Sequence, residues 1–451
     1  MTRRSPREFR GISFGGVRLT LRGWGFLAGA VFCFVLAYAA GQHQLLYVAT
    51  LLAALPVAAL ISVRARRPRL SATRAFAPHV IPAGSTATVS LSVRNTAARP
   101  SARALWSDAL PWRPGFTPEA ELRSLSPRGA RFASRNTTTL QYELRPPRRG
   151  IFPVGPMRVE LRDGFGLAIS TTDVGGAENV TVTPEVVALA ETGLSLPAGD
   201  GESRLVQRRG AGDDDDAMTR EYRQGDAMRR VHWRASARHG DLMVRQEEQR
   251  SFPEARVIVD TRREGYDDAI DDDDDDAESL AFEWAVRMLA STAVHLRRMG
   301  FLVTIEETAL PQLESVNRGR RRTWGDEEFL ASLASITLAD TMGERLSGHA
   351  SDRDQGAKGP IIAMLGNPET ETVDWLLRQR RPGELAVAFL ARSVTAIEQI
   401  DRSFGAGAGT TAVGDRLTEA GWLVVQVRAD DDHAAVWEAV VVETGRGRGN
   451  G

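Results

Sequence analysis

The stretch from residue 256 to residue 260 reads RVIVD, a short run of mostly β-branched residues that ends on an acidic one. Such a run predicts a buried strand. Four similar runs follow along the chain, at 301–305, 360–365, 385–390 and 422–427. Helical patterns alternate with them, at 278–299, 326–336, 369–378, 412–420 and 433–441. This alternation predicts an α/β domain over residues 255–443 with a doubly wound, mainly parallel sheet.

Asp260 stands at the carboxyl end of the first of these strands. Doubly wound sheets bind ligands at that edge, so Asp260 is a candidate binding residue. Two aspartate runs, 213–216 and 271–276, interrupt this part of the chain. Like charges repel and stay solvated, so we expect flexible loops there. Either run could hold a divalent cation, although neither has the spacing of an EF-hand.

Residues 85–95 read STATVSLSVRN and alternate strictly between apolar and polar side chains. This period of two predicts a half-buried strand. The alternation recurs at 137–145, 157–162 and 179–183, with turns rich in Pro and Gly between the runs. We therefore expect an all-β, β-sandwich-like module over residues 70–190, whose simplest role is a spacer or docking platform.

Residues 23–63 contain no Asp, Glu, Lys or Arg, and a polar turn at 41–44 divides them into two apolar stretches. A helix needs about 20 apolar residues to cross a bilayer, so the sequence predicts a two-helix transmembrane hairpin. Arginines flank it on both sides. The positive-inside rule then places the basic N-terminus (residues 1–22) and the soluble bulk in the cytoplasm, at the inner (plasma) membrane. A signal peptide cleaved near Ala37-Tyr38-Ala39 is the alternative.

Composition excludes several classes of function. The net charge is -1, from 57 basic and 58 acidic side chains, so no global field favours nucleic acid as a partner. The single cysteine, Cys33, excludes an intramolecular disulfide and a multi-cysteine zinc site. Lys358 is the only lysine and is followed by glycine, which excludes a P-loop. No H-E-x-x-H motif is present, and we nominate no catalytic residues and expect a protein that is not an enzyme.

Residues 220–250 hold eight arginines against five acidic residues. Gly225-Asp226 is a turn signal, and Asp226 can cap a helix predicted over 227–238. On such a helix, positions four apart share one face. That face would carry Arg230, Arg234 and Arg238.

Two interpretations of this arginine face stay open. In the first, the arginines pair with acidic residues and fasten the segment to the α/β domain; those acids are Asp226, Asp241, Glu247 and Glu248. In the second, the face is a docking site for an acidic partner or a phosphorylated ligand, because guanidinium groups grip carboxylate or phosphate with two hydrogen bonds. Trp233 is large enough to anchor the segment in either case.

The same segment resembles the hallmark of the domain-of-unknown-function 58 family, Y-x-x-G-D-x-x-R-x-x-x-W-x-x-x-A-R. The matching residues are Tyr222, Gly225, Asp226, Arg229, Trp233, Ala237 and Arg238. A second family-like element comprises Arg149, Gly150, Asp163, Phe165, Gly166 and Leu167. It departs from the family at Gly164, where proline is common. We accordingly treat residues 200–250 as the family motif segment and residues 444–451 as a flexible tail.

The resemblance implies a membrane-anchored bacterial protein with a von Willebrand factor type A-like domain. It also implies two partners, a MoxR-type AAA ATPase and a transglutaminase-like membrane protein. We therefore expect a membrane-anchored scaffold or adaptor whose cytoplasmic type A-like domain binds proteins. The alternative is an enzyme or ligand-binding protein that acts on a phosphorylated or cell-envelope-related substrate through Asp260, Asp226 and the arginine face.

One departure bears on metal binding. Type A domains that bind Mg²⁺ carry D-x-S-x-S after the first strand, because hydroxyls and carboxylates are hard oxygen ligands. Here Asp260 is kept, but Arg262 and Glu264 replace the two serines. We therefore expect a degenerate site with no metal and no cofactor.

Overall fold

The computed structural model describes fourteen parts of the chain. They are residues 16–112, 114–129, 136–190, 219–222, 228, 231, 233–245, 254–266, 268, 279–313, 325–339, 359–380, 383–392 and 408–446. Both aspartate runs lie outside these ranges. The chain divides into two compact units. The first comprises Met1–Glu185, Asp273–Ala277 and Arg322–Ile336, and the second comprises Val186–Asp272, Glu278–Arg321 and Thr337–Gly451.

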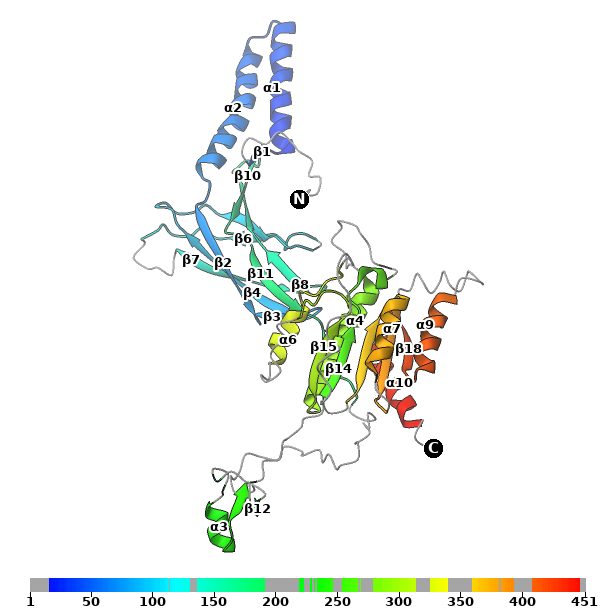
Figure 1. Cartoon of the computed structure of the whole chain (residues 1–451). Helices are drawn as coiled ribbons and strands as arrows, with labels where there is room; N and C mark the ends of the chain where they lie inside the picture. Colours follow the sequence, from blue (N-terminus) through cyan, green and yellow to red (C-terminus); the bar gives the residue numbers. More distant parts are fainter. Residues whose placement is uncertain are drawn as a thin grey trace. The chain divides into compact units, whose positions relative to one another are not determined.

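The second unit holds a five-stranded sheet in which every neighbouring pair is parallel (Figure 1). The strands are β14 (Glu254–Val259), β15 (Leu302–Glu307), β16 (Ile361–Leu365), β17 (Ala386–Arg392) and β18 (Leu423–Arg428). Their order is β15-β14-β16-β17-β18, which is 2-1-3-4-5 along the chain. This is a doubly wound order whose switch point lies beside β14. The predicted α/β class and parallel sheet are confirmed.

Helices cover both faces of this sheet. They are α4 (Leu280–Arg298), α7 (Thr370–Gln379), α9 (Ala408–Glu419) and α10 (His433–Arg446). Ala388 of β17 shares a core with Leu376 of α7 and Leu417 of α9. The next residue, Phe389, points to the opposite face, where its ring contacts Trp284 of α4. Since α10 runs to Arg446, it includes the first residues of the predicted tail, and the rest of that tail lies outside the described residues.

The first unit contains an all-β module of three sheets, with orders β1-β10-β9-β5-β6, β2-β4-β7 and β3-β11-β8. Four strands coincide with predicted ones: β4 (Ala87–Asn95), β7 (Thr137–Leu144), β9 (Met157–Arg162) and β11 (Glu178–Thr183). The others are β1 (Val17–Leu19), β2 (Leu70–Ala77), β3 (Val80–Pro82), β5 (Ala104–Asp108), β6 (Ala120–Leu122), β8 (Gly150–Val154) and β10 (Ala168–Val174). The sequence pattern did not predict these seven strands, because most are short and their alternation is interrupted.

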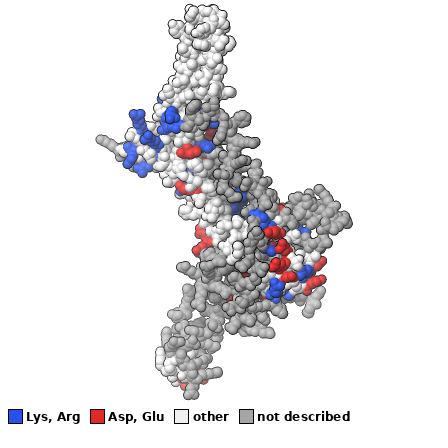
Figure 2. Space-filling model, turned by 45° about the horizontal axis from the view of Figure 1, so that its top comes forward, with Lys and Arg blue, Asp and Glu red and all other residues white. Residues whose placement is uncertain are grey.

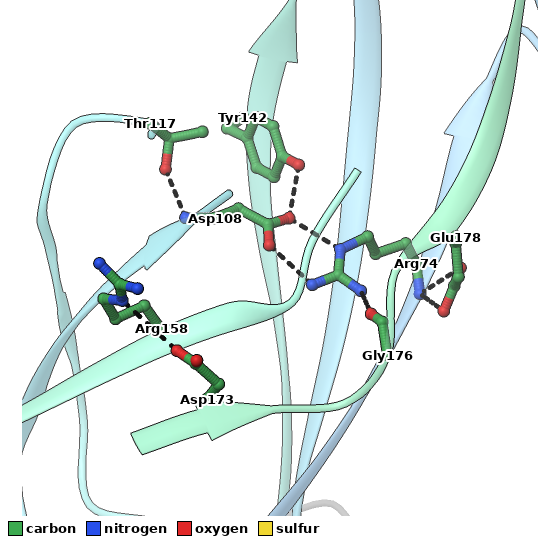
Figure 3. Close-up of polar contacts among 8 residues, drawn as sticks. All are labelled: Arg74, Asp108, Thr117, Tyr142, Arg158, Asp173, Gly176 and Glu178. Carbon is green, nitrogen blue, oxygen red and sulfur yellow. Dashed lines mark hydrogen bonds and ion pairs between the residues drawn. The ribbon is translucent and has the colours of Figure 1, made fainter. Parts of the chain in front are cut away.

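A buried ion pair joins two of these sheets (Figure 3). Arg74 of β2 donates from Nη2 to Asp108 Oδ1 at 2.7 Å and from Nε to Oδ2 at 2.8 Å, and both side chains are fully buried. Tyr142 of β7 donates its hydroxyl to the same carboxylate at 2.6 Å. Burial alone would lower the pKa of Arg74, but the hydrogen bond and charge of Asp108 raise it above its ordinary value. Arg74 therefore stays protonated inside the module.

Helix α6 (Asp326–Leu333) belongs to the first unit, where it contacts β11. Its sequence lies between two strands of the parallel sheet, and the sequence pattern alone predicts it as part of the α/β domain. Arg149, at the start of the second family-like element, donates from Nη2 to the carbonyl of Ile336 at 2.8 Å. This hydrogen bond fastens the chain just after α6 to the β-module.

Helices α1 (Leu21–Ala39) and α2 (Gln44–Ala65) pack against each other as a hairpin (Figure 1). Both are long and apolar enough to cross a membrane. Large apolar side chains face outward, among them Phe32, Tyr47 and Ile61. The buried positions are instead taken mainly by small residues, such as Ala30, Ala37, Ala49 and Ala59. This distribution is the reverse of a soluble core helix and is typical of membrane helices, which pack through small residues.

Candidate functional site

Asp260 follows β14 directly and lies at the switch point of the parallel sheet, with no solvent exposure. Its N–H donates to the carbonyl of Met364 on the neighbouring strand β16 at 2.9 Å. Its carbonyl accepts a hydrogen bond from the hydroxyl of Tyr266 at 2.9 Å. The backbone on both sides of the carboxylate is therefore held in place.

The two oxygens of the Asp260 carboxylate differ in their environment. Oδ1 accepts from the Arg262 N–H at 3.2 Å, from Arg262 Nε at 3.4 Å and from the hydroxyl of Thr308. Oδ2 is buried without a hydrogen-bond partner among the described residues. It lies against Gly265, where a Cβ would collide with it. Burial raises the pKa of Asp260 above its ordinary range, although the charge of Arg262 and the hydrogen bond from Thr308 act in the opposite direction.

Arg262 reaches from this carboxylate to the start of α7 and is only 4% exposed. Its Nη1 lies 3.3 Å from Oε2 of Glu369, and its Nη2 donates to the hydroxyl of Thr372. Glu369 is the residue before α7, and Thr372 lies in the first turn of that helix. The guanidinium thus connects the carboxyl end of β14 to α7 and closes this part of the sheet edge.

These residues do not fit a divalent cation. The position between Asp260 and Glu369 that such an ion would need is occupied by the guanidinium of Arg262. Glu264 has an exposed side chain, whereas Asp260 is fully buried. Among the described residues there is no group of three or more His, Cys, Asp or Glu that could hold a metal. Arg262 itself supplies the positive charge that faces the two carboxylates.

Sequence reasoning found Asp260 and Arg262 but missed Thr308, Glu369 and Thr372. Thr308 comes directly after β15, and Glu369 follows β16 by four residues. Carboxyl ends of parallel strands meet at one edge, so polar residues just after each predicted strand were the available signal.

The arginine-rich segment forms a small structure of its own. Strands β12 (Thr219–Glu221) and β13 (Met243–Arg245) pair antiparallel, and α3 (Trp233–His239) lies between them in sequence. The N–H of Tyr222 donates to the carbonyl of Leu242 at 2.7 Å. Val231 is buried and forms an isolated bridge with Val244.

That bridge corrects the predicted helix over 227–238. Val231 has strand-like pairing, and the helix that the structure describes begins at Trp233. Arg230 lies outside the described residues, as do Gly225, Asp226 and Arg229 and the side chain of Arg234. Pairing of these arginines with Asp226 therefore stays a prediction.

Trp233 was expected to anchor the segment, and its observed exposure is against this. Its side chain is 66% exposed. Met228 and Leu242 are exposed as well, and so are Ala237 and Arg238 on α3. The motif therefore presents apolar side chains and a guanidinium to solvent.

Comparison with protein families identifies this segment. The family model described as protein of unknown function DUF58 matches residues 218–317. These residues belong to the DUF58 family. The matched range contains the motif and also β14, α4 and β15, so the DUF58 segment includes Asp260, Arg262 and Thr308.

Other comparisons add little to the DUF58 match. No curated protein matches this chain. The CARDB domain of a Pyrococcus furiosus protein is 13% identical over 26% of this chain and 88% of that chain, with a TM-score of 0.18. A family two carbohydrate esterase from Cellvibrio japonicus is 13% identical over 84% of this chain and 98% of that chain, with a TM-score of 0.20. Scores this low carry no argument about fold or function.

The second family-like element lies outside the DUF58 match, and its residues 163–167 form a tight turn after β9. Asp163 accepts from the N–H of Phe165 at 2.8 Å, of Leu167 at 2.7 Å and of Ala168 at 2.6 Å. Gly166 has a φ of 69°, which glycine adopts without strain. The structure thus brings Asp163, Phe165, Gly166 and Leu167 into one turn. Arg149 and Gly150 lie elsewhere in the first unit, beside α6 and at the start of β8.

The buried carboxylate of the DUF58 segment predicts a pH effect. A raised pKa means that the folded protein holds the Asp260 proton above the pH at which the unfolded chain releases it. Asp260 should therefore stabilise less as the pH rises from about 4 to its raised pKa, by at most about 1.4 kcal/mol per unit. Denaturant unfolding of the wild type and Asp260→Asn across this range measures the effect. If the wild type instead becomes more stable relative to Asp260→Asn as the pH rises, the folded protein does not hold the Asp260 proton.

Proposed function

We propose that this protein is a membrane-anchored scaffold or adaptor whose von Willebrand factor type A-like α/β domain binds protein partners in the cytoplasm. The exposed Trp233 carries the proposal. Tryptophan and arginine are the residues most enriched among side chains that dominate binding energy at protein interfaces. Trp233 and Arg238 are both exposed on the same short helix of the DUF58 segment.

The carboxyl edge of the sheet favours a structural role for Asp260 and Arg262 over a catalytic one. Asp260 is fully buried, and Arg262 is occupied by Glu369 and Thr372. A catalytic carboxylate must come within hydrogen-bond reach of a substrate, and Asp260 has no such access in this arrangement. This edge therefore serves to order the start of α7.

The partner we favour is an AAA ATPase of the MoxR type, and a transglutaminase-like membrane protein is the second. Both follow from the resemblance to the family. The competing function is an enzyme or ligand-binding protein acting on a phosphorylated or cell-envelope-related substrate. The raised pKa of Asp260 at a switch point is the observation that favours it, because perturbed carboxylates gather at functional sites.

Binding of the full chain in lipid nanodiscs to a purified MoxR-type AAA ATPase tests the proposal. The scaffold function predicts a complex that elutes together in size-exclusion chromatography, with no hydrolysis of phosphate esters or peptidoglycan fragments by the chain alone. Hydrolysis that disappears in Asp260→Asn, without complex formation, would favour the enzyme instead.

Membrane topology gives a further prediction. The span from Gly23 to Val63 lacks charged residues, and arginines flank it on both sides, so both termini should be cytoplasmic. Alkaline phosphatase, which is active only outside the cytoplasm, should give no signal when fused to the C-terminus. The same reporter fused within the 41–44 turn should be active. A strongly active C-terminal fusion would overturn this topology.

A further inference from the structure

Exposed arginines gather at the base of the α1–α2 hairpin. Figure 2 shows the hairpin without charged side chains and Lys or Arg side chains near its base. The exposed ones around the ends of the two helices are Arg18, Arg22, Arg64, Arg66 and Arg69, called here the basal arginines. Within the part of the chain that the structure describes, none of the five forms an ion pair.

Acidic groups that could neutralise the basal arginines are scarce or already occupied. The chain contains no Asp or Glu between residues 9 and 107. Asp163 is the acidic residue of the turn that contacts α1, and its carboxylate accepts three backbone N–H groups. Glu160 pairs with Arg162 at 2.7 Å. The base of the hairpin therefore keeps a net positive charge that an external anion can neutralise.

The Asp163–Leu167 turn is held against the first residues of α1. The N–H of Thr20 donates to the carbonyl of Leu167 at 2.9 Å, and its hydroxyl donates to the carbonyl of Gly166 at 2.7 Å. A Cβ at Gly23 would collide with the Leu167 carbonyl, so only glycine allows this approach. These contacts fix the height of the turn relative to the span.

Phe165, at the tip of this turn, is 72% exposed. The turn contacts the start of α1, so Phe165 lies level with the end of the apolar span, where Trp24 is also exposed. Aromatic side chains are enriched at this depth of a bilayer, between headgroups and acyl chains. Three hydrogen bonds to Asp163 close the turn, so the exposed side chain of Phe165 is not needed to fold it.

We infer that the base of the hairpin is a binding site for anionic lipids. The basal arginines hold the phosphate headgroups, and Phe165 inserts beside the acyl chains. The inference rests on the proposed insertion of the hairpin in a membrane. Each arginine near an anionic surface favours binding about fivefold, so a few suffice for a clear preference over zwitterionic lipid. The site would hold the β-module at a fixed height above the bilayer.

Lipid selectivity of the full chain tests the headgroup site. In vesicles, electron paramagnetic resonance compares the association of spin-labelled phosphatidylglycerol and phosphatidylcholine with the protein. We expect a preference of about fivefold or more for phosphatidylglycerol, which weakens at high salt. Arg22→Gln/Arg66→Gln/Arg69→Gln should lower this preference by about fivefold or more. Arg145→Gln/Arg298→Gln changes exposed arginines elsewhere in the chain and should leave it intact.

Depth measurement tests the turn. Cys33 is the only cysteine, so Cys33→Ala gives a background for single spin labels. A label at Phe165→Cys should be accessible to oxygen and protected from a polar nickel reagent. A label at Glu143→Cys, exposed on β7, should show the opposite.

The outcomes separate the lipid site from membrane insertion. Release of the wild-type chain by alkaline carbonate would overturn insertion itself. A retained chain with equal association of both lipids would overturn the headgroup site alone. Equal depth of the two spin labels would show that Phe165 is not part of the lipid site.

Discussion

Asp108→Asn is expected to destabilise the first unit by about 3–5 kcal/mol, because it leaves the buried guanidinium of Arg74 without a counter-ion. The substitution keeps the size of the side chain and removes its charge. The carbonyl of Gly176 still accepts from Arg74 Nη1 at 2.7 Å, but a neutral acceptor does not compensate a buried charge (Figure 3). In calorimetry of the full chain, the transition of the first unit should fall by about 6–20 °C.

Figure 3 also contains the matched control. Arg158 and Asp173 pair at 3.4 Å, with 34% and 53% of their side chains exposed. Asp173→Asn should cost less than about 1 kcal/mol, since exposed ion pairs contribute little. Replacing both buried partners, as in Arg74→Met/Asp108→Leu, should recover part of the loss. Equal falls in melting temperature for Asp108→Asn and Asp173→Asn would show that the buried ion pair stabilises the first unit no more than the exposed one.

Arg262→Met is expected to destabilise the second unit by about 3–5 kcal/mol. It removes the cation that contacts both Asp260 and Glu369, so Asp260 is left buried and its pKa rises further. Because the missing charge favours the protonated form, the variant should lose more stability at neutral pH than at pH 4. Calorimetry at the two pH values measures both effects. The double variant Arg262→Met/Asp260→Asn should be less destabilised at neutral pH than Arg262→Met.

Arg416→Met is the control for this site. Arg416 pairs with Asp374 at 2.6 Å in the same unit, but their side chains are 41% and 45% exposed, so the cost should stay below about 1 kcal/mol. Mg²⁺ should leave the melting temperature of the wild type unchanged, since Arg262 occupies the cation position. A Mg²⁺-dependent rise that Asp260→Ala abolishes would contradict this role of Arg262.

Much of the α/β domain could be predicted from the sequence because its local patterns agree with its tertiary structure. Strands such as β16 are buried on both faces and read as continuous apolar runs. In the β-module the local sequence pattern and the tertiary structure disagree. The alternation of β2 places Arg74 between Ala72 and Phe76 on the buried face. Arg74 on this apolar face was therefore a signal of a buried ion pair. The same charged residue interrupts the apolar pattern, so the sequence predicted neither the strand nor the ion pair.

The candidate site shows a different limit. Asp260 and Arg262 are neighbours in sequence, so their proximity could be predicted. Thr372 comes from a segment more than 100 residues away, and only the sheet order brings it to Arg262. Helical spacing alone also gave the wrong structure for Val231, because its pairing with Val244 prevails over the local helical preference. Long-range pairing is information that periodicity does not carry.

We propose that the exposed motif of the DUF58 segment binds a protein partner, and one affinity comparison tests this proposal most directly. The dissociation constant of a MoxR-type AAA ATPase is measured for the full chain in nanodiscs and for Trp233→Ala, whose melting temperature should be unchanged because the side chain is 66% exposed. Loss of an interface tryptophan costs about 2 kcal/mol or more, so binding should weaken about thirtyfold. No binding by the wild type, or equal affinities for the two chains, would contradict the account.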